Sequence, residues 1–410
     1  MLLFASLLSG CSGIAPAART QPTASTSTES PTRTERAQRL VDDIVTIGRR
    51  GGSTAEFMSA RDRVFAARAA VWSANLARID WSVLTWTVRS REANLSASRR
   101  AALGPDAWVQ SVTVSWALPH EARTAEEDLW LTFVDEPAVD GGAPTLRLAG
   151  DTDGPAAGSP APIWWQQPVH LKRDGATMLL TADDHTAWLG QASSAQRAVR
   201  KRIGVAHRDP GGSLVVEIPQ SRTAFERTLG VPSTSYGQVA AAAWPMGTDT
   251  STAPIHVVVN PEATARLSEL GRDVLLTHEA VHVATRSPGS PAPTWLVEGY
   301  ADRIAYRAHP TADAPARKAV RDAVRERGVP RDWPAEDDFA PQAADLDLSY
   351  DLAWTAARSI AMAHGDDALN RFYAAVDGGA SLAEAAAKIG STEGQLRERW
   401  RADLGDLAAR

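Results

Sequence analysis

The 410-residue chain contains one cysteine, Cys11, so no disulfide can form within it. Its stability must therefore come from apolar cores, and 44% of its residues are hydrophobic. After a short apolar run at the N-terminus no second long apolar segment follows, which argues against a membrane-spanning helix. No internal repeat is present. The chain exceeds one ordinary domain in length, and two domains are expected.

An extended basic block is also missing, and the formal net charge is −6. Nucleic-acid binding therefore has no electrostatic support. The one basic cluster lies on a predicted helix and is interpreted as a solvated face: Arg197, Arg200, Lys201 and Arg202.

Residues 34–184 predict a first domain of the α+β class. Apolar residues recur at helical spacing over 34–76, with a break at Gly51 and Gly52. Alternating segments then predict strands near 81–88, 109–116, 129–133, 146–148 and 178–180. Helices followed by a curved antiparallel sheet resemble the cystatin or nuclear-transport-factor-like cone. The tryptophans of these strands are expected in a core, with a ligand-lining role as the alternative.

Residues 185–410 predict a second domain that begins with mixed helices and strands. Helices are expected at 191–203 and 224–229, and strands at 214–218, 239–244 and 255–260. A charged amphipathic surface helix is expected at 314–327, and a further helix near 350–364. Closing helices with apolar stripes, which cap the domain, are expected at 369–376, 382–389 and 396–404. His256 alternates away from Ile255 and Val257 and is interpreted as a structural or substrate-adjacent residue.

The stretch 278–282, His-Glu-Ala-Val-His, carries the strongest chemical signal in the sequence. Histidines four residues apart on a helix lie one turn above the other, so both rings face the same point. Two imidazoles and one carboxylate are what a catalytic zinc ion requires. Glu279 would lie beside the metal, where it can act as a general base.

A second predicted helix after Pro293 supplies the carboxylate. Glu298 follows His282 after fifteen residues, and Asp302 shares its helical face. With Glu298 on the metal, Asp302 can accept the free ring N–H of a ligand histidine. The alternative for the whole group is a pair of core histidines and a solvated acidic face.

This pattern resembles the gluzincin metallopeptidases, and 298–302, Glu-Gly-Tyr-Ala-Asp, is similar to the glutamate helix of their peptidase MA-like members. The resemblance implies a zincin-like domain with a helical cap and one zinc ion on His278, His282 and Glu298. It implies that an edge strand pairs with extended substrate, and 255–260 is expected in this part, with a fully paired inner strand as the alternative. Tyr350, which opens a later helix, resembles the family's oxyanion donor, with a buried structural tyrosine as the alternative.

The implied activity is hydrolysis of peptide bonds in a peptide or protein substrate. The chain lacks the Gly-x-Met-Glu-Asn stretch that clamps a substrate amino terminus in the aminopeptidases, which favours an endopeptidase. A catalytically silent surface lipoprotein that uses both domains for binding is the alternative. The presence of Glu279 argues for catalysis. The sequence leaves the substrate and the oligomeric state open.

Residues 8–11, Leu-Ser-Gly-Cys, resemble the lipobox of bacterial lipoproteins, in which the cysteine is lipidated and the preceding residues are removed. The resemblance implies a signal segment at 1–11 and an extracytoplasmic protein anchored to the cell membrane through Cys11. Residues 12–33 are rich in Ser, Thr, Pro and Ala and predict a flexible tether. An ordinary apolar N-terminus with an incidental cysteine is the alternative.

Overall fold

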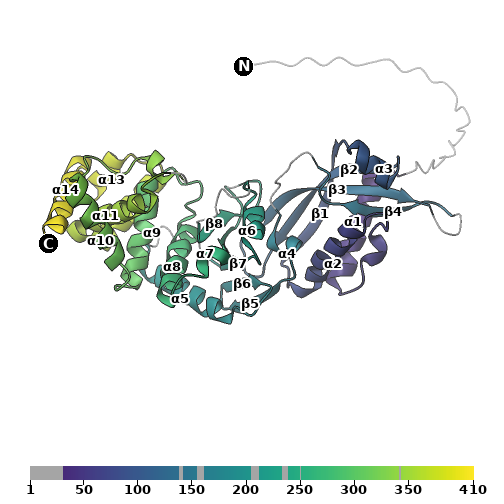
Figure 1. Ribbon diagram of the computed structural model, residues 1–410, viewed down its shortest axis with the longest axis horizontal. Helices are drawn as coiled ribbons and strands as arrows, with labels where there is room; N and C mark the ends of the chain where they lie inside the picture. The colour runs from purple at the N-terminus through teal and green to yellow at the C-terminus, as the bar shows by residue number, and fades with distance from the viewer. Residues whose placement is uncertain are drawn as a thin grey trace, which may run out of the picture.

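A computed structural model describes residues 31–137, 142–154, 161–204, 212–232, 239–249, 251–340 and 343–410. The predicted signal segment with Cys11, and residues 12–30 of the predicted tether, lie outside the described residues. Figure 1 shows an elongated molecule in which an N-terminal helix-and-sheet unit, a central sheet and a set of C-terminal helices follow one another. The fold is α+β, as predicted, with one antiparallel and one mixed sheet.

The N-terminal unit is a four-stranded antiparallel sheet in the order β1-β2-β3-β4, with helices packed on it. The capping box of Thr32 and Glu35 starts the first helix, and Gly51 follows its end in a left-handed conformation. The elements are α1 (Arg33–Arg49), η1 (Ala55–Phe57), α2 (Arg63–Arg78), β1 (Val83–Ala93), α3 (Ala97–Leu103), β2 (Trp108–Ala117), β3 (Ala125–Glu136) and β4 (Thr145–Gly150).

Tryptophans fill the core between α2 and the sheet, so the core interpretation of these residues is confirmed. Trp72 stacks on Trp165 with ring centroids 4.6 Å apart, and Trp164 meets Trp81 edge-on at 5.1 Å. Buried tryptophans of this kind include Trp81, Trp86, Trp108, Trp116, Trp164 and Trp165, whereas Trp130 is only partly buried. Large aromatic surfaces of this kind supply much of the apolar burial that a chain without disulfides needs.

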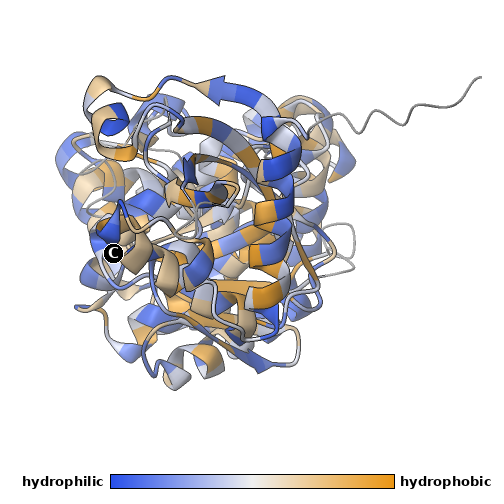
Figure 2. Ribbon diagram, turned by 90° about the vertical axis from the view of Figure 1, so that its right-hand side faces the viewer, coloured by the Kyte–Doolittle hydropathy of each residue, from blue (hydrophilic) through white to orange (hydrophobic). Residues whose placement is uncertain are grey.

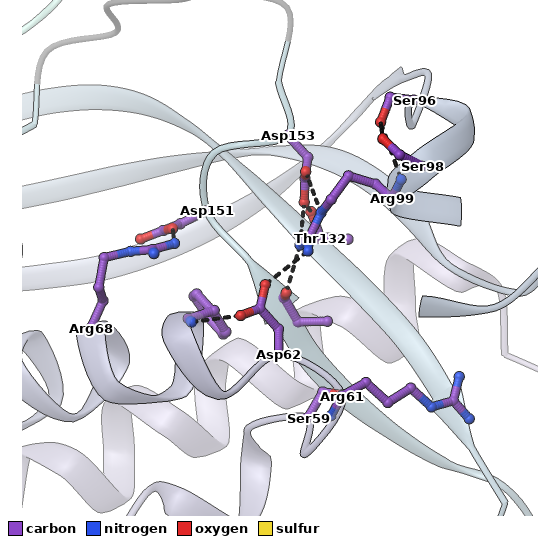
Figure 3. Close-up of polar contacts among 12 residues, drawn as sticks. Ser59, Arg61, Asp62, Arg68, Ser96, Ser98, Arg99, Thr132, Asp151 and Asp153 are labelled. Atoms are coloured by element: carbon purple, nitrogen blue, oxygen red, sulfur yellow. Dashed lines mark hydrogen bonds and ion pairs between the residues drawn. The ribbon is translucent and has the colours of Figure 1, made fainter. Parts of the chain in front are cut away.

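A polar network ties the helices of this unit to the end of β4 (Figure 3). Arg99 donates to Asp153 at 2.7 Å and to Asp62 at 2.8 Å. Asp62 is also the N-cap of α2 and accepts from the backbone N–H of Phe65. Thr132 donates to the second oxygen of Asp153, so one arginine connects α3, the start of α2 and the sheet.

The central sheet is mixed, with the strand order β5-β6-β7-β9-β8. Its elements are α4 (Ile163–Gln166), β5 (His170–Asp174), β6 (Thr177–Thr181), α5 (Thr186–Arg202), β7 (Leu214–Ile218), α6 (Arg222–Leu229), β8 (Ala241–Pro245), β9 (Ile255–Val259), α7 (Pro261–Thr264) and α8 (Glu269–Thr285). The strand predicted at 178–180 belongs to this sheet and pairs in parallel with β7, so its expected place in the first sheet is wrong. A buried strand has the same apolar sequence pattern in either sheet, because the pattern does not specify the strands with which it pairs.

Alternate residues of the central strands enter two different cores. Leu179, Val216 and Val257 face the core shared with α5 and α8. Met178, Val215 and Val258 face the tryptophan-rich core of the N-terminal unit. The helices in Figure 2 carry both hydrophobic and hydrophilic bands, as amphipathic helices that cover a core do. The central sheet therefore joins the two halves through side chains on both of its faces.

The expectation that 255–260 forms the edge strand is wrong. β9 pairs with β7 on one side and β8 on the other, and β8 is the strand at the edge. Every residue of β9 is buried, which agrees with the inner position. The edge is the small-residue strand that precedes β9 in the chain.

The C-terminal helices follow α8 and pack against α8, α5 and one another. They are α9 (Thr294–Ala308), α10 (Ala314–Arg327), η3 (Glu336–Phe339), α11 (Leu346–His364), α12 (Asp366–Asp377), α13 (Leu382–Lys388) and α14 (Glu393–Ala409). These ranges lie close to those the sequence predicts. Gly299 lets α9 approach α11, because a Cβ at this position would lie 2.2 Å from the carbonyl oxygen of Ala353.

A buried charged group connects the N-terminal unit to the central sheet. The two ring nitrogens of His256 on β9 lie 2.7 Å from Glu217 on β7 and 2.8 Å from Glu121 in the β2–β3 hairpin. Burial disfavours the charged ring, but the two carboxylates outweigh it and raise the pKa of His256 to about 9. Nearby, burial and the charges of Asp128 and Glu217 raise the pKa of Glu127 to about 8.

His256 should stabilise the fold most below its ordinary pKa of 6.5, and this stabilisation should fade as the pH rises through about 9. We expect His256→Gln to lower the free energy of unfolding by roughly 2–4 kcal/mol at pH 6 and by much less at pH 9.5. Urea unfolding of both proteins across this range measures the difference. His364→Gln, at an exposed position, is the control. A difference that does not change with pH would contradict the assignment.

Candidate metal centre

The helix α8 carries three of the predicted site residues. Ser268 caps its start by accepting from the backbone N–H of Gly271, and Arg286 ends it in a left-handed conformation. Leu276, Ala280 and Val281 bury one side of the helix in the core that the central sheet shares with α5 and α8. His278 and His282 point to the other side, one turn apart, with ring centroids 4.6 Å from each other.

The helix α9 delivers the carboxylate to the same point. Nε2 of His278 lies 2.8 Å from Nε2 of His282 and 3.1 Å from Oε2 of Glu298, which lies 3.4 Å from Nε2 of His282. Ligands about 2.0–2.1 Å from a tetrahedral zinc ion are themselves about 3.3 Å apart. The donor types and their spacing therefore fit a zinc ion, and no other group of three such residues is this close in the described parts of the chain.

The carboxylates of Glu298 and Asp302 favour a positive charge at this point. Burial works against a charged ring, but Asp302 and Glu298 outweigh it and raise the pKa of His278 well above its ordinary value. Burial would raise the pKa of Glu298, but His282 and His278 outweigh it and lower the pKa. A cation held between these side chains satisfies the carboxylate in a site that is largely shielded from water.

Both histidines face the cluster through Nε2, and each has a partner on Nδ1 as well. Nδ1 of His278 lies 2.7 Å from Oδ1 of Asp302, as the sequence predicts. Nδ1 of His282 lies 2.7 Å from the hydroxyl of Ser287, just beyond the end of α8. The sequence analysis missed Ser287, because a serine after a helix end carries no distinctive pattern. Both contacts leave Nε2 free to face the cluster.

Glu279 lies between this cluster and the edge of the central sheet. Its carboxylate is buried, with 6% of the residue exposed, and accepts from the backbone N–H of Ala243 at 2.8 Å. Ala240 and Met246, which flank β8, bond to Asn260 and Pro254, which flank β9. In the antiparallel register of the two strands, the odd-numbered Ala241 and Ala243 therefore turn their backbone groups away from β9. No sequence signal could reveal this contact, because the donor is a backbone group.

Tyr350 lies on α11 beside the same acidic groups. Burial first, then the charges of Glu298, Glu279 and Asp302, raise its pKa. Its ring meets Phe339 edge-on at 5.5 Å, and its hydroxyl has no hydrogen-bond partner among the residues that the structure describes. Its neighbour Asp351, which the sequence analysis did not select, has a pKa raised to about 7 by burial and by Asp302 and Asp347.

Replacing Asp302 should weaken metal binding, since Nδ1 of His278 would lose its carboxylate partner. We expect Asp302→Ala to raise the Kd for Zn²⁺ about 10- to 100-fold in a competition titration with a chelating dye. Asp347→Asn is the matched control, because it removes an exposed acidic charge nearby without touching His278. Equal losses in both variants would show a general charge effect instead.

Gly299 should be needed for the spacing of α9 and α11. We expect Gly299→Ala to lower the melting temperature and to weaken Zn²⁺ binding, because the added Cβ moves Glu298 together with its helix. Gly394→Ala, where a Cβ has only one neighbour at 4.0 Å, is the control. Unchanged zinc affinity in Gly299→Ala would contradict this account.

Comparison with models of protein families gave no match, and comparison with curated proteins gave none either.

Proposed function

We propose that this protein is a zinc-dependent metallopeptidase of the gluzincin type that hydrolyses peptide bonds. The observation that carries the proposal is the convergence of His278, His282 and Glu298, with Glu279 between them and a free strand edge. The proposal includes a zincin-like assignment for the central sheet with α8 and α9, and a cone-like assignment for the N-terminal unit.

One zinc ion would be held by Nε2 of both histidines and by Glu298. When bound, it supplies Lewis acidity, which makes water nucleophilic near neutral pH. Asp302 fixes the ring of His278 so that Nε2 remains available to the ion.

Glu279 is the proposed general base. The hydrogen bond from Ala243 holds one carboxylate oxygen, which leaves the other free to take a proton from the attacking water. The same carboxyl group can then give this proton to the leaving amine nitrogen. Its burial strengthens both interactions, because little solvent competes for the carboxylate.

The free edge of β8 is the proposed platform for substrate. The backbone groups of Ala241 and the carbonyl of Ala243 do not bond to β9 and can pair with an extended peptide, as in strand addition, while the N–H of Ala243 donates to Glu279. The small side chains of Ala241 to Ala243 leave room for an extended chain beside this part of the strand. We favour an endopeptidase because the sequence lacks the Gly-x-Met-Glu-Asn stretch that clamps a chain end in the aminopeptidases.

Tyr350 is the proposed donor to the oxyanion of the tetrahedral intermediate. A phenol with its ordinary pKa of about 10 is already protonated at neutral pH, and the raised pKa of Tyr350 extends this to higher pH, so its hydroxyl can donate a hydrogen bond.

For location, we propose an extracytoplasmic protein anchored to the cell membrane by lipid at Cys11. Among the helices of the described residues, none is both long and apolar enough to cross a bilayer.

The test is the variant Glu279→Gln, which keeps an acceptor for the N–H of Ala243 but loses basicity. We expect it to bind one zinc ion per chain and to cleave a peptide library at least 100-fold more slowly than the wild type. Glu269→Gln, an exposed position on the same helix, should cleave normally. A chelator should abolish wild-type cleavage, and added Zn²⁺ should restore it.

Two results would overturn parts of this proposal. Cleavage by Glu279→Gln at the wild-type rate would remove Glu279 as the base. A wild-type protein that binds zinc but cleaves nothing in the library would favour the silent binding lipoprotein.

A further inference from the structure

The end of α8 forms a turn that brings Ser287 back to a metal-ligand candidate. Arg286 adopts φ 56°, and the backbone N–H of Ser287 donates to the carbonyl of His282 at 3.0 Å. This turn places the Ser287 hydroxyl 2.7 Å from Nδ1 of the same histidine. Ser287 thus contacts both the backbone and the ring of His282.

Arginine is an unusual residue for the left-handed position. Glycine is the common choice, because a Cβ there lies too close to the neighbouring backbone. The Arg286 guanidinium donates to the carbonyls of Ser251 at 3.1 Å and Ala253 at 2.9 Å. Both acceptors lie in the loop between β8 and β9. The side chain therefore connects the end of the metal helix to this loop, a contact that glycine cannot make.

The β8–β9 loop is also held by the β2–β3 hairpin. The backbone N–H of Thr248 donates to the carbonyl of Glu126 at 3.0 Å, and Arg123 donates to the carbonyl of Thr252 at 3.3 Å. Gly247, at φ 140°, lies so close that a Cβ would be 2.9 Å from the Glu126 carbonyl oxygen. These contacts hold the loop in place, so the hydrogen bonds from Arg286 to the loop can fix the position of the turn at the end of α8.

We propose that Ser287 is the positioning residue of His282 and that Arg286 holds Ser287 in place by tying the turn to the β8–β9 loop. The inference rests on the proposed function, since it assigns His282 to the metal. With Nε2 facing the ion, Nδ1 carries the proton and donates it to the Ser287 hydroxyl. His278 meets a carboxylate and His282 a neutral hydroxyl, so the two rings are held by partners of different basicity.

The experiment measures Zn²⁺ affinity by chelator competition and the visible absorption spectrum of the Co²⁺-substituted protein. Ser287→Ala should raise the Kd for Zn²⁺ about 10- to 100-fold and shift the cobalt spectrum. Ser287→Thr, which keeps the hydroxyl, should restore both toward wild type. Arg286→Gly keeps the left-handed turn but loses the guanidinium, and should raise the Kd at least threefold.

Ser290→Ala is the matched control, because Ser290 lies in the same connection but donates to Asp377. It should leave the zinc affinity and the cobalt spectrum unchanged. Wild-type affinity and spectrum in Ser287→Ala would overturn the role of Ser287, and wild-type affinity in Arg286→Gly would overturn the role of Arg286. A wild-type protein that binds no zinc would instead overturn the proposed function, so the two failures are distinguishable.

Discussion

The close approach of α8 and α9 is the constraint on which the site depends. Three donor atoms from these helices lie within 3.4 Å of one another: the Nε2 atoms of His278 and His282 and Oε2 of Glu298. Such a cluster persists only if packing fixes both helices, because a shift of 1 Å separates the donors. Gly299 provides part of this fixation, since it brings α11 against the turn that carries Glu298.

The edge strand extends this constraint to the central sheet. Ala243 donates to Glu279, so the depth of α8 on the sheet and the position of the candidate base are set together. Beside this bond, the carbonyl of Ala243 and the backbone groups of Ala241 face away from β9. Substrate, base and metal would then be aligned by one helix-on-sheet contact, which is how a rigid scaffold holds a reacting group in productive geometry.

The N-terminal unit contributes more than a separate fold. Its β2–β3 hairpin reaches His256 through Glu121 and holds the β8–β9 loop through backbone contacts of Glu126. The two faces of the central sheet enter two cores, one on each side. The N-terminal unit is therefore part of the support beneath the candidate metal centre, and the central sheet transmits that support.

The sequence by itself determined the features that depend on local periodicity. Helical spacing paired His278 with His282 and Glu298 with Asp302, and the helices after the site lie close to their predicted ranges. The structure brings the two pairs together. Strand partners were decided only by the tertiary structure. The strand at 178–180 joined the second sheet, and β8 took the edge position in place of β9, because an apolar strand does not encode its neighbours. Ser287 and the N–H of Ala243 were also beyond reach of the sequence, since a single hydroxyl or backbone group gains its role only from what folding places beside it.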